Sequence, residues 1–408
     1  MTTGMKRLLD PATRTRPGKA RRRRALPALI SVLVAGVAVL ALVTITRSPG
    51  TAPLATELVP APPPSPGLAA PVRPVGYWEQ RYLESWEYDR ENGLAASRQP
   101  DSWKHYEISY DVDANTAMYR ATGQPRYLQR ALEYVENVVA TARRSSSLPT
   151  SQYRDRYIGW VSQRPDLDPS GVEVPLYESY FWRYATTLLR IMRQTPAVYA
   201  DTAYRARYER LLGFAQEHIF DKWYDRGVED NIYRSRTHLV AHWSTIALNL
   251  SLLSDDPQRQ ARYRAVLDAI DRDLPNSSSS LRGQLRRSPA EPSAYFWSDQ
   301  WGSARRPGQD VSHGNAVVSY LVEARDHGRY WTDADMAGLA ATLTKVIWPG
   351  GRRYAAFVDG TGSDNGWFSD GFVKLGRYDR TVQQRLEGHE VVNAQFAANM
   401  ALNVRLLS

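Results

Sequence analysis

One short stretch of the chain brings chemically active side chains to the expected start of a helix. In residues 305–328, RRPGQDVSHGNAVVSYLVEARDHG, Asp310 precedes a segment with helical apolar spacing and His313 falls in its first turn. A helix N-terminus disfavours the imidazolium form, so this histidine would be neutral and able to accept a proton. His313 shares a helical face with Val317 and Ala324, which predicts that it points inward. We expect general base catalysis, and a structural core histidine is the alternative.

Polar clusters of the same kind open the other long amphipathic segments. Enzymes use carboxylates, histidines and tyrosines for general acid–base chemistry, and the same groups also serve as helix caps. Capping alone is therefore an alternative role for Asp310. The clusters are Asp111, Asp113 and Asn115; Glu173, Glu178 and Tyr180; Arg236, His238 and His242; Asp310, His313 and Asn315; and Asp364, Asn365, Trp367 and Asp370.

Two histidines and one arginine in these clusters suggest further chemistry. His238 and His242 are four residues apart and share a helical face, so they could bind zinc with His313 as a third ligand. No glutamate accompanies them as in the metalloprotease helix motif, and we expect no metal site. Arg236 could bind the carboxylate of a substrate, and a surface ion pair is its alternative role.

The elements that must position these clusters are expected to be paired helices. Apolar residues recur at helical spacing in residues 77–92 and then in segments joined by short turns, with no strand-rich block. The chain is therefore predicted to be all-α, with five or six antiparallel helical hairpins. Thr332 is the expected N-cap of one return helix. The predicted pairs are 106–122 with 127–142, 176–196 with 204–220, 238–257 with 260–274, 310–328 with 332–348, and 369–379 with 391–407.

One hairpin carries a motif. Residues 115–135, NTAMYRATGQPRYLQRALEYV, resemble the recurring unit of the six-hairpin (α/α)-toroid enzymes, a superfamily of glycoside hydrolases, polysaccharide lyases and sugar epimerases. The rhythm of hairpins extends over most of residues 77–408. The resemblance implies an (α/α)5-6 toroid whose inner helices begin at one rim, where their loops form a sugar-binding cleft. The polar clusters would then converge on that rim.

On this basis we assign expected roles to individual residues. Aromatic rings such as those of Trp297 and Trp301 could stack on the apolar faces of sugars. The expected catalytic residues are His313, His242, Asp310, Asp113 and Tyr180, and the expected substrate-binding residues are Arg236, Asn315, Trp297, Trp301, His238, Trp367, Asp370 and Glu178.

Three reactions fit such a site. A histidine or tyrosine could remove a proton from a uronic acid in β-elimination, two carboxylates could hydrolyse a glycosidic bond, and two histidines could epimerise a sugar. We favour cleavage of a polysaccharide. The alternative is a non-catalytic glycan-binding or cell-envelope scaffold protein, whose centre would be filled by side chains.

The charge of the chain is concentrated at its N-terminus. The net charge is +9, and residues 1–24 hold nine Lys or Arg against one acid, which accounts for +8 of it. Residues 26–45 follow as an uncharged apolar run of the length of a membrane helix. The positive-inside rule predicts a cytoplasmic tail and an extracytoplasmic C-terminal domain. We expect an uncleaved anchor, with a cleaved signal peptide as the alternative, and no nucleic-acid partner.

The remaining segments complete the domain plan. Residues 46–76 are rich in proline and alanine and are predicted to form an extended linker, so the domains are 1–24, 25–45, 46–76 and 77–408. There is no cysteine, which excludes disulfides and thiolate chemistry. The folded part contains no phosphate-binding glycine loop and no dinucleotide fingerprint, so we expect no cofactor. The expected partners are a polysaccharide or oligosaccharide and the membrane.

Overall fold

The computed structural model describes residues 71–164 and 171–408, and this part of the chain is mostly helical. The prediction of an all-α fold is therefore confirmed. The only strands among the described residues are two antiparallel pairs of two residues each, β1 (Arg143–Arg144) with β2 (Ile158–Gly159) and β3 (Arg286–Arg287) with β4 (Tyr295–Phe296). The predicted basic tail, membrane helix and most of the linker lie outside the described residues.

The search for membrane spans covered the described residues alone. None of their helices has both the length and the apolar character that crossing a bilayer requires.

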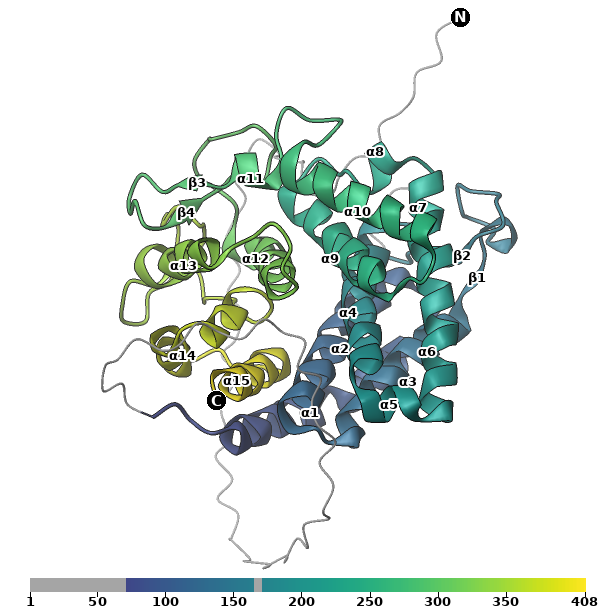
Figure 1. The fold of residues 1–408 in the computed structure, drawn as a ribbon, viewed down its shortest axis with the longest axis horizontal. Helices are drawn as coiled ribbons and strands as arrows, with labels where there is room; N and C mark the ends of the chain where they lie inside the picture. The colour runs from purple at the N-terminus through teal and green to yellow at the C-terminus, as the bar shows by residue number, and fades with distance from the viewer. Residues whose placement is uncertain (1–70, 165–170) are drawn as a thin grey trace, which may run out of the picture.

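Six segments pack in succession around the centre of the domain (Figure 1). Each contacts the next, and the last contacts the first. Nearly every residue in the middle of these segments is buried, including polar ones, because each segment is covered on all sides. In chain order they are α2 (Ser102–Thr122), α4 (Pro175–Gln194), α9 (Thr237–Leu253), α12 (Val311–Asp326), the 3-10 helix η5 (Phe372–Arg377) and α15 (Ala394–Leu407).

A second set of helices packs on the outside of the first. Helix α1 contacts α15 and α2, α3 contacts α2, α6 contacts α4, α10 contacts α9, α13 contacts α12 and η5, and α14 contacts η5. These helices are buried on one face only, as expected for an amphipathic outer layer. Their bounds are α1 (Val75–Ser97), α3 (Pro125–Thr141), α6 (Thr202–Phe214), α10 (Pro257–Arg272), α13 (Asp333–Ala341) and α14 (Arg380–Glu387).

Short helices connect the two sets. They are η2 (Ser145–Ser147), α5 (Pro196–Ala200), η3 (Ala215–Asp221), α7 (Lys222–Asp225), α8 (Val228–Asn231), α11 (Leu281–Gln284) and η4 (Thr342–Ile347), of which η3 and η4 are π-helical continuations of α6 and α13.

Local signals in the sequence account for most of these boundaries. Helix α2 ends at Gly123, whose φ of 71° is left-handed, and Pro125 opens α3 at once, so the predicted first hairpin is confirmed. Thr332 forms a capping box with Asp335 at the start of α13, as predicted. The second, third and fourth hairpins are also present.

The prediction for the fifth hairpin is wrong in one respect. Only Phe372–Arg377 of its first segment is helical, as the short η5, and α14 lies between it and α15. Two close approaches explain the shortness. A Cβ atom at Gly371 would lie 2.0 Å from the backbone oxygen of Asn315, and one at Gly376 would lie 2.4 Å from the side chain of Gln383. Glycine is needed at both positions, and it disfavours a long helix.

Candidate functional site

The first halves of α2, α4, α9 and α12 lie together at one end of the domain, which we call the rim. Side chains near the starts of neighbouring helices contact one another: Tyr110 of α2 lies beside Tyr180 of α4, and Tyr180 beside His242 of α9. His238 of α9 in turn lies beside His313 of α12. The predicted convergence of polar clusters is therefore correct for these residues.

An aspartate and a histidine form a hydrogen-bonded pair at the start of α12. Asp310 is the N-cap and accepts a hydrogen bond from the backbone nitrogen of His313 at 3.0 Å. Nδ1 of His313 lies 2.9 and 3.0 Å from the two carboxylate oxygens. Because an ionised carboxylate can only accept, Nδ1 carries the proton and Nε2 is the atom that can take one from a substrate. Asp310 thus both caps α12 and orients the imidazole of His313.

The electrostatics of this pair keep Asp310 ionised. Burial alone would raise its pKa, but the hydrogen bonds from His313 and from the hydroxyl of Ser312 hold that pKa well below the usual range. The side chain of His313 is 53% exposed, so the prediction that it points inward is wrong. Its ring lies against His238, because the first turn of α12 stands at the rim and the apolar stripe begins one turn later.

Two further histidines line the same side of the rim. His238 is half-buried and its ring centre lies 4.6 Å from that of His313. Burial, followed by the nearby His313, lowers the pKa of His238 to about 3. His242 is 1% exposed, neither ring nitrogen has a partner, and burial lowers its pKa well below the usual range. Both rings are therefore neutral at physiological pH.

A band of aromatic side chains continues from the histidines. Tyr180 and Tyr110 join their hydroxyls in a hydrogen bond of 2.7 Å, and Tyr106 packs on Tyr180 with ring centres 4.1 Å apart. Trp367 lies edge-on to Tyr110. All four rings are partly exposed. Rings with polar hydroxyls suit the apolar faces and hydroxyl groups of sugars.

Buried charges fill the interior beneath these rings. Arg183 pairs with Asp370 at 2.8 Å, and the ammonium of Lys374 lies 3.8 Å from both Asp370 and Asp113. Gln395 donates to Asp113 at 2.8 Å. These side chains are at most 7% exposed. Asp113 and Asp370 therefore stabilise the interior through these pairs and are not open to a substrate, contrary to the prediction.

Two predicted substrate-binding residues are structural. Asn315 is 1% exposed and donates to the backbone oxygen of Trp367 at 2.7 Å, while its own oxygen accepts from the backbone nitrogens of Gly371 and Phe372. Its hydrogen bonds thus join α12 to the loop before η5. Trp297 is fully buried, and a Cβ atom at Gly314 would lie 3.4 Å from its ring. That indole packs under the first turn of α12 and cannot stack on a sugar.

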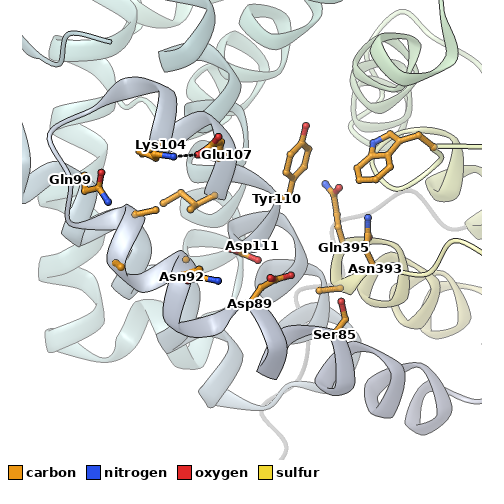
Figure 2. A pocket seen from close by; sticks show the side chains of 16 residues that line it. Ser85, Asp89, Asn92, Gln99, Lys104, Glu107, Tyr110, Asp111, Asn393 and Gln395 are labelled. Atoms are coloured by element: carbon orange, nitrogen blue, oxygen red, sulfur yellow. Dashed lines mark hydrogen bonds and ion pairs between the residues drawn. The ribbon is translucent and has the colours of Figure 1, made fainter. Parts of the chain in front are cut away.

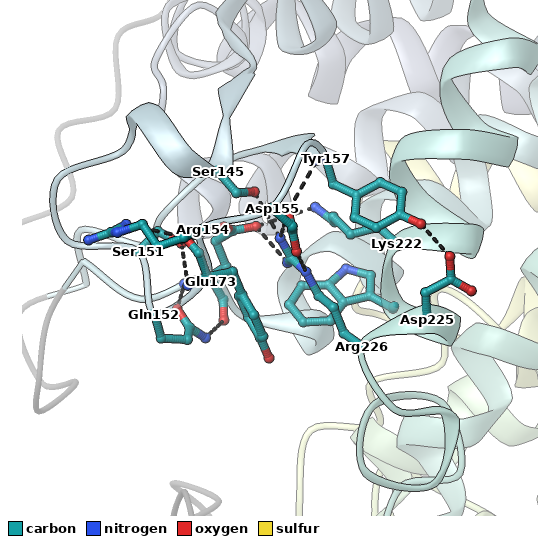
Figure 3. A network of polar contacts seen from close by, with 12 residues as sticks. Ser145, Ser151, Gln152, Arg154, Asp155, Tyr157, Glu173, Lys222, Asp225 and Arg226 are labelled. Atoms are coloured by element: carbon teal, nitrogen blue, oxygen red, sulfur yellow. Dashed lines mark hydrogen bonds and ion pairs between the residues drawn. The ribbon is translucent and has the colours of Figure 1, made fainter.

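Glu178 faces away from the rim. Its carboxylate accepts hydrogen bonds from Lys222 and from the indole of Trp223, and Lys222 is also 3.6 Å from Glu173. These residues belong to a buried network in which Arg226 holds Glu173 and Asp155 (Figure 3). The network joins the loop before α4 to α7. The prediction of a substrate contact at Glu178 is therefore wrong.

Two further predicted substrate contacts, Arg236 and Trp301, are partly exposed and also bonded within the protein. Arg236 forms an ion pair with Asp299, and its side chain is 11% exposed. An ion pair was the alternative role predicted for Arg236. The guanidinium is also close enough to His238 to lower the pKa of that histidine. Trp301 is partly exposed and donates its indole hydrogen to the backbone oxygen of Arg234 at 2.7 Å.

A pocket of about 580 Å³ opens beside the aromatic band (Figure 2). Helices α1 and α2 form its walls, and the start of α15 and Trp367 close one end. Its polar lining residues are Ser85, Asp89, Asn92, Gln99, Lys104, Glu107, Tyr110, Asp111, Asn393 and Gln395.

The sequence contained signals for some residues that our predictions missed. On α2, Trp103, Tyr106 and Tyr110 are spaced three and four residues apart and so share a face, which could have identified the aromatic band. Arg183 carried no such signal, because its partner Asp370 is distant in the sequence. Lys374 follows Asp370 by four residues, and that spacing could have suggested their pairing.

The described residues contain no group of three or more His, Asp or Glu side chains arranged to hold a metal ion. Comparison of the chain with protein-family models, with curated proteins and with solved structures gives no match.

Proposed function

We propose that residues 77–408 form an (α/α)6 toroid that acts on a glycan at its rim. The support for this architecture is the cyclic order of contacts among α2, α4, α9, α12, η5 and α15, each with an outer helix packed on it. Loops and first turns meet at one end of such a ring, so polar side chains from distant segments can surround one sugar chain.

The reaction we propose is β-elimination in a uronic-acid polysaccharide, with His313 as the base. The observation that carries this proposal is the exposed His313 imidazole, whose Nδ1 is held by Asp310, so that Nε2 is the nitrogen able to accept a proton. A base must be accessible and in a fixed tautomer, and this pair provides both properties. His313 would remove the proton from C5, the electrons of that C–H bond would form the C4–C5 double bond, and the C4–O4 bond would break. The departing O4 oxygen would take a proton from water.

Neighbouring side chains fit the same reaction. Arg236 lies close to His238, and it would share its guanidinium between Asp299 and the uronate carboxylate. The aromatic band of Tyr180, Tyr106, Tyr110 and Trp367 would bind adjoining sugars through their apolar faces. Hydrolysis is less well supported, because two of the candidate carboxylates, Asp113 and Asp370, are buried in ion pairs and a third, Asp310, is held by His313.

We further propose that residues 26–45 anchor the protein in a membrane and leave the catalytic domain outside the cytoplasm. The support is the uncharged apolar run preceded by basic residues, followed by a proline-rich spacer. A surface polysaccharide would then be within reach of the rim.

A non-catalytic glycan-binding protein is the second candidate. One observation favours it: Arg183, Asp370, Lys374 and Asp113 fill the interior beneath the rim. Binding by aromatic side chains alone would require no exposed base.

Incubation of the full-length protein with uronic-acid and neutral polysaccharides tests the proposal. We expect ultraviolet absorbance from unsaturated sugars, and we expect it to be lost in His313→Ala. His218→Ala, a histidine on the outer helix η3, is the matched control and should retain activity. Reducing ends without absorbance would assign hydrolysis instead, and tight binding without any product would support the second candidate.

A further inference from the structure

The pocket between α1 and α2 contains polar groups that have no partner within the protein. Asp111 lines its inner part, and neither of its carboxylate oxygens has a hydrogen bond or ion pair among the described residues. Outside the lining of the pocket, the hydroxyl of Tyr134 is buried, in a residue that is 1% exposed, and also lacks a partner. A buried polar group without a partner is unfavourable, so a native structure seldom retains one without a reason.

Both groups lie against Gly93 of α1. A Cβ atom at residue 93 would lie 2.7 Å from the Tyr134 hydroxyl and 2.9 Å from Oδ2 of Asp111. Gly93 itself lines the pocket. Glycine at this position therefore lets both oxygens approach the backbone of α1, and the carboxylate of Asp111 reaches the wall of the pocket.

The charge of the pocket indicates the sign of that ligand group. Asp89 stands at the mouth on α1, also without a cation partner (Figure 2). The cation in the lining, Lys104, is already paired with Glu107 at 2.7 Å. Burial and the neighbouring charge of Asp89 raise the pKa of Asp111 to about 7, as expected for a carboxylate that lacks a counter-ion. A bound cation would reverse this shift.

We infer that this pocket binds a sugar unit carrying a free amino group, whose ammonium donates hydrogen bonds to the carboxylate of Asp111. The rest of the lining suits a sugar ring. Trp367 and Tyr110 offer aromatic surface, and Asn92, Gln99, Asn393 and Gln395 offer amides for hydroxyl groups. The volume of about 580 Å³ lies within the usual range for small-molecule sites.

The choice of a sugar rests on the proposed function, and the choice of an ammonium does not. A divalent cation is disfavoured because the described residues offer no set of three ligands. The pocket adjoins the aromatic band through Tyr110, which is hydrogen-bonded to Tyr180. The pocket would therefore hold a sugar unit at a distance from the glycosidic bond whose cleavage His313 starts.

Calorimetric titration of the full-length protein near neutral pH tests the inference. Three β-1,4 tetrasaccharides of equal length serve as probes, built from glucosamine, N-acetylglucosamine and glucose. We expect the glucosamine oligomer to bind at least about 10-fold more tightly than the other two, because hydrogen bonds between charged groups are the strong ones.

Two variants with matched controls locate the binding. Asp111→Asn should weaken binding of the glucosamine oligomer by about 10-fold or more, while Glu91→Gln on the exposed face of α1 should not. Gly93→Ala should abolish the preference, since its methyl group would occupy the space beside Asp111. Gly213→Ala on α6, where a Cβ atom meets nothing within 4 Å, should have no effect.

Equal binding of the three oligomers, or unchanged binding in Asp111→Asn, would overturn the inference. Spermidine binding as tightly as the oligomer would overturn the assignment to a sugar. His313→Ala distinguishes the two proposals: it should leave the amino-sugar preference intact, even if no substrate is ever cleaved.

Discussion

The two ends of the inner helices handle polar residues in opposite ways. At the rim, His313 is exposed, His242 has no hydrogen-bond partner and Asp111 has no cation. At the opposite end, Arg190 pairs with Glu323 at 2.6 Å and Arg377 pairs with Asp326 at 3.0 Å. The opposite end holds its buried charges in ion pairs, and the rim, above ion pairs of its own, also keeps groups that a ligand could satisfy. This difference separates stability from function in the domain.

The largest effect is expected from breaking a pair at the opposite end. Glu323→Ala would leave Arg190 buried without its carboxylate and lower the free energy of unfolding by about 3–5 kcal/mol, the usual cost of an unpaired buried charge. Denaturant unfolding measures this loss. Asp268→Ala, which removes an exposed partner of Arg329, is the control and should change stability by less than about 1 kcal/mol. Equal losses in the two variants would contradict the contrast between the ends.

Next in size is the loss of the proposed base. His313→Gln should lower the rate of glycan cleavage by about 100-fold or more, the usual contribution of general base catalysis. Because the side chain is exposed, the melting temperature should hardly change. A variant that unfolds easily but cleaves normally would place His313 with the structural residues.

Asp310→Asn should have a smaller effect on rate. Its amide can still accept from the backbone of His313, so the helix cap remains. The charge that fixes the tautomer is lost, and we expect the rate to fall by about 10-fold or more with little change in affinity for the glycan. Steady-state kinetics separate the two quantities, and a change in affinity alone would assign Asp310 to binding.

The smallest effect concerns stability and pH at Asp111. Its pKa is raised to about 7 in the folded state, because of burial and Asp89, so the folded protein holds a proton that the unfolded chain releases. Ionised Asp111 therefore destabilises the fold above about pH 7, and this cost disappears below about pH 4. Asp111→Asn should stabilise the protein by about 2 kcal/mol at about pH 8, and by much less at about pH 5. The same gain in stability at both pH values would contradict the raised pKa of Asp111.

The sequence predicted much of the helical framework because helix signals are local. Gly123, Pro125 and Thr332 mark turns and caps through interactions within a few residues, and apolar spacing shows which face is buried. The closing of six inner segments into a cycle depends on contacts between distant helices, which spacing does not encode.

The candidate site was predicted less well for the same reason. Asp310 acts as the predicted cap because its partners are two and three residues away. The predicted role of Glu178 failed because Lys222, 44 positions later, neutralises its carboxylate. Trp297 and Asn315 could not be recognised as buried, since the segments that cover them come from other parts of the chain.

Exchange of the hydrogen at C5 of a uronic-acid oligosaccharide tests the central claim most directly. The full-length protein would be incubated with the oligosaccharide in deuterium oxide, and the products examined by mass spectrometry and nuclear magnetic resonance. If His313 removes the C5 proton, wild-type protein should yield either an unsaturated sugar or deuterium at C5, and His313→Gln should yield neither. Glycan that is bound, or cleaved to reducing ends, with the C5 hydrogen retained throughout would contradict proton abstraction at this site.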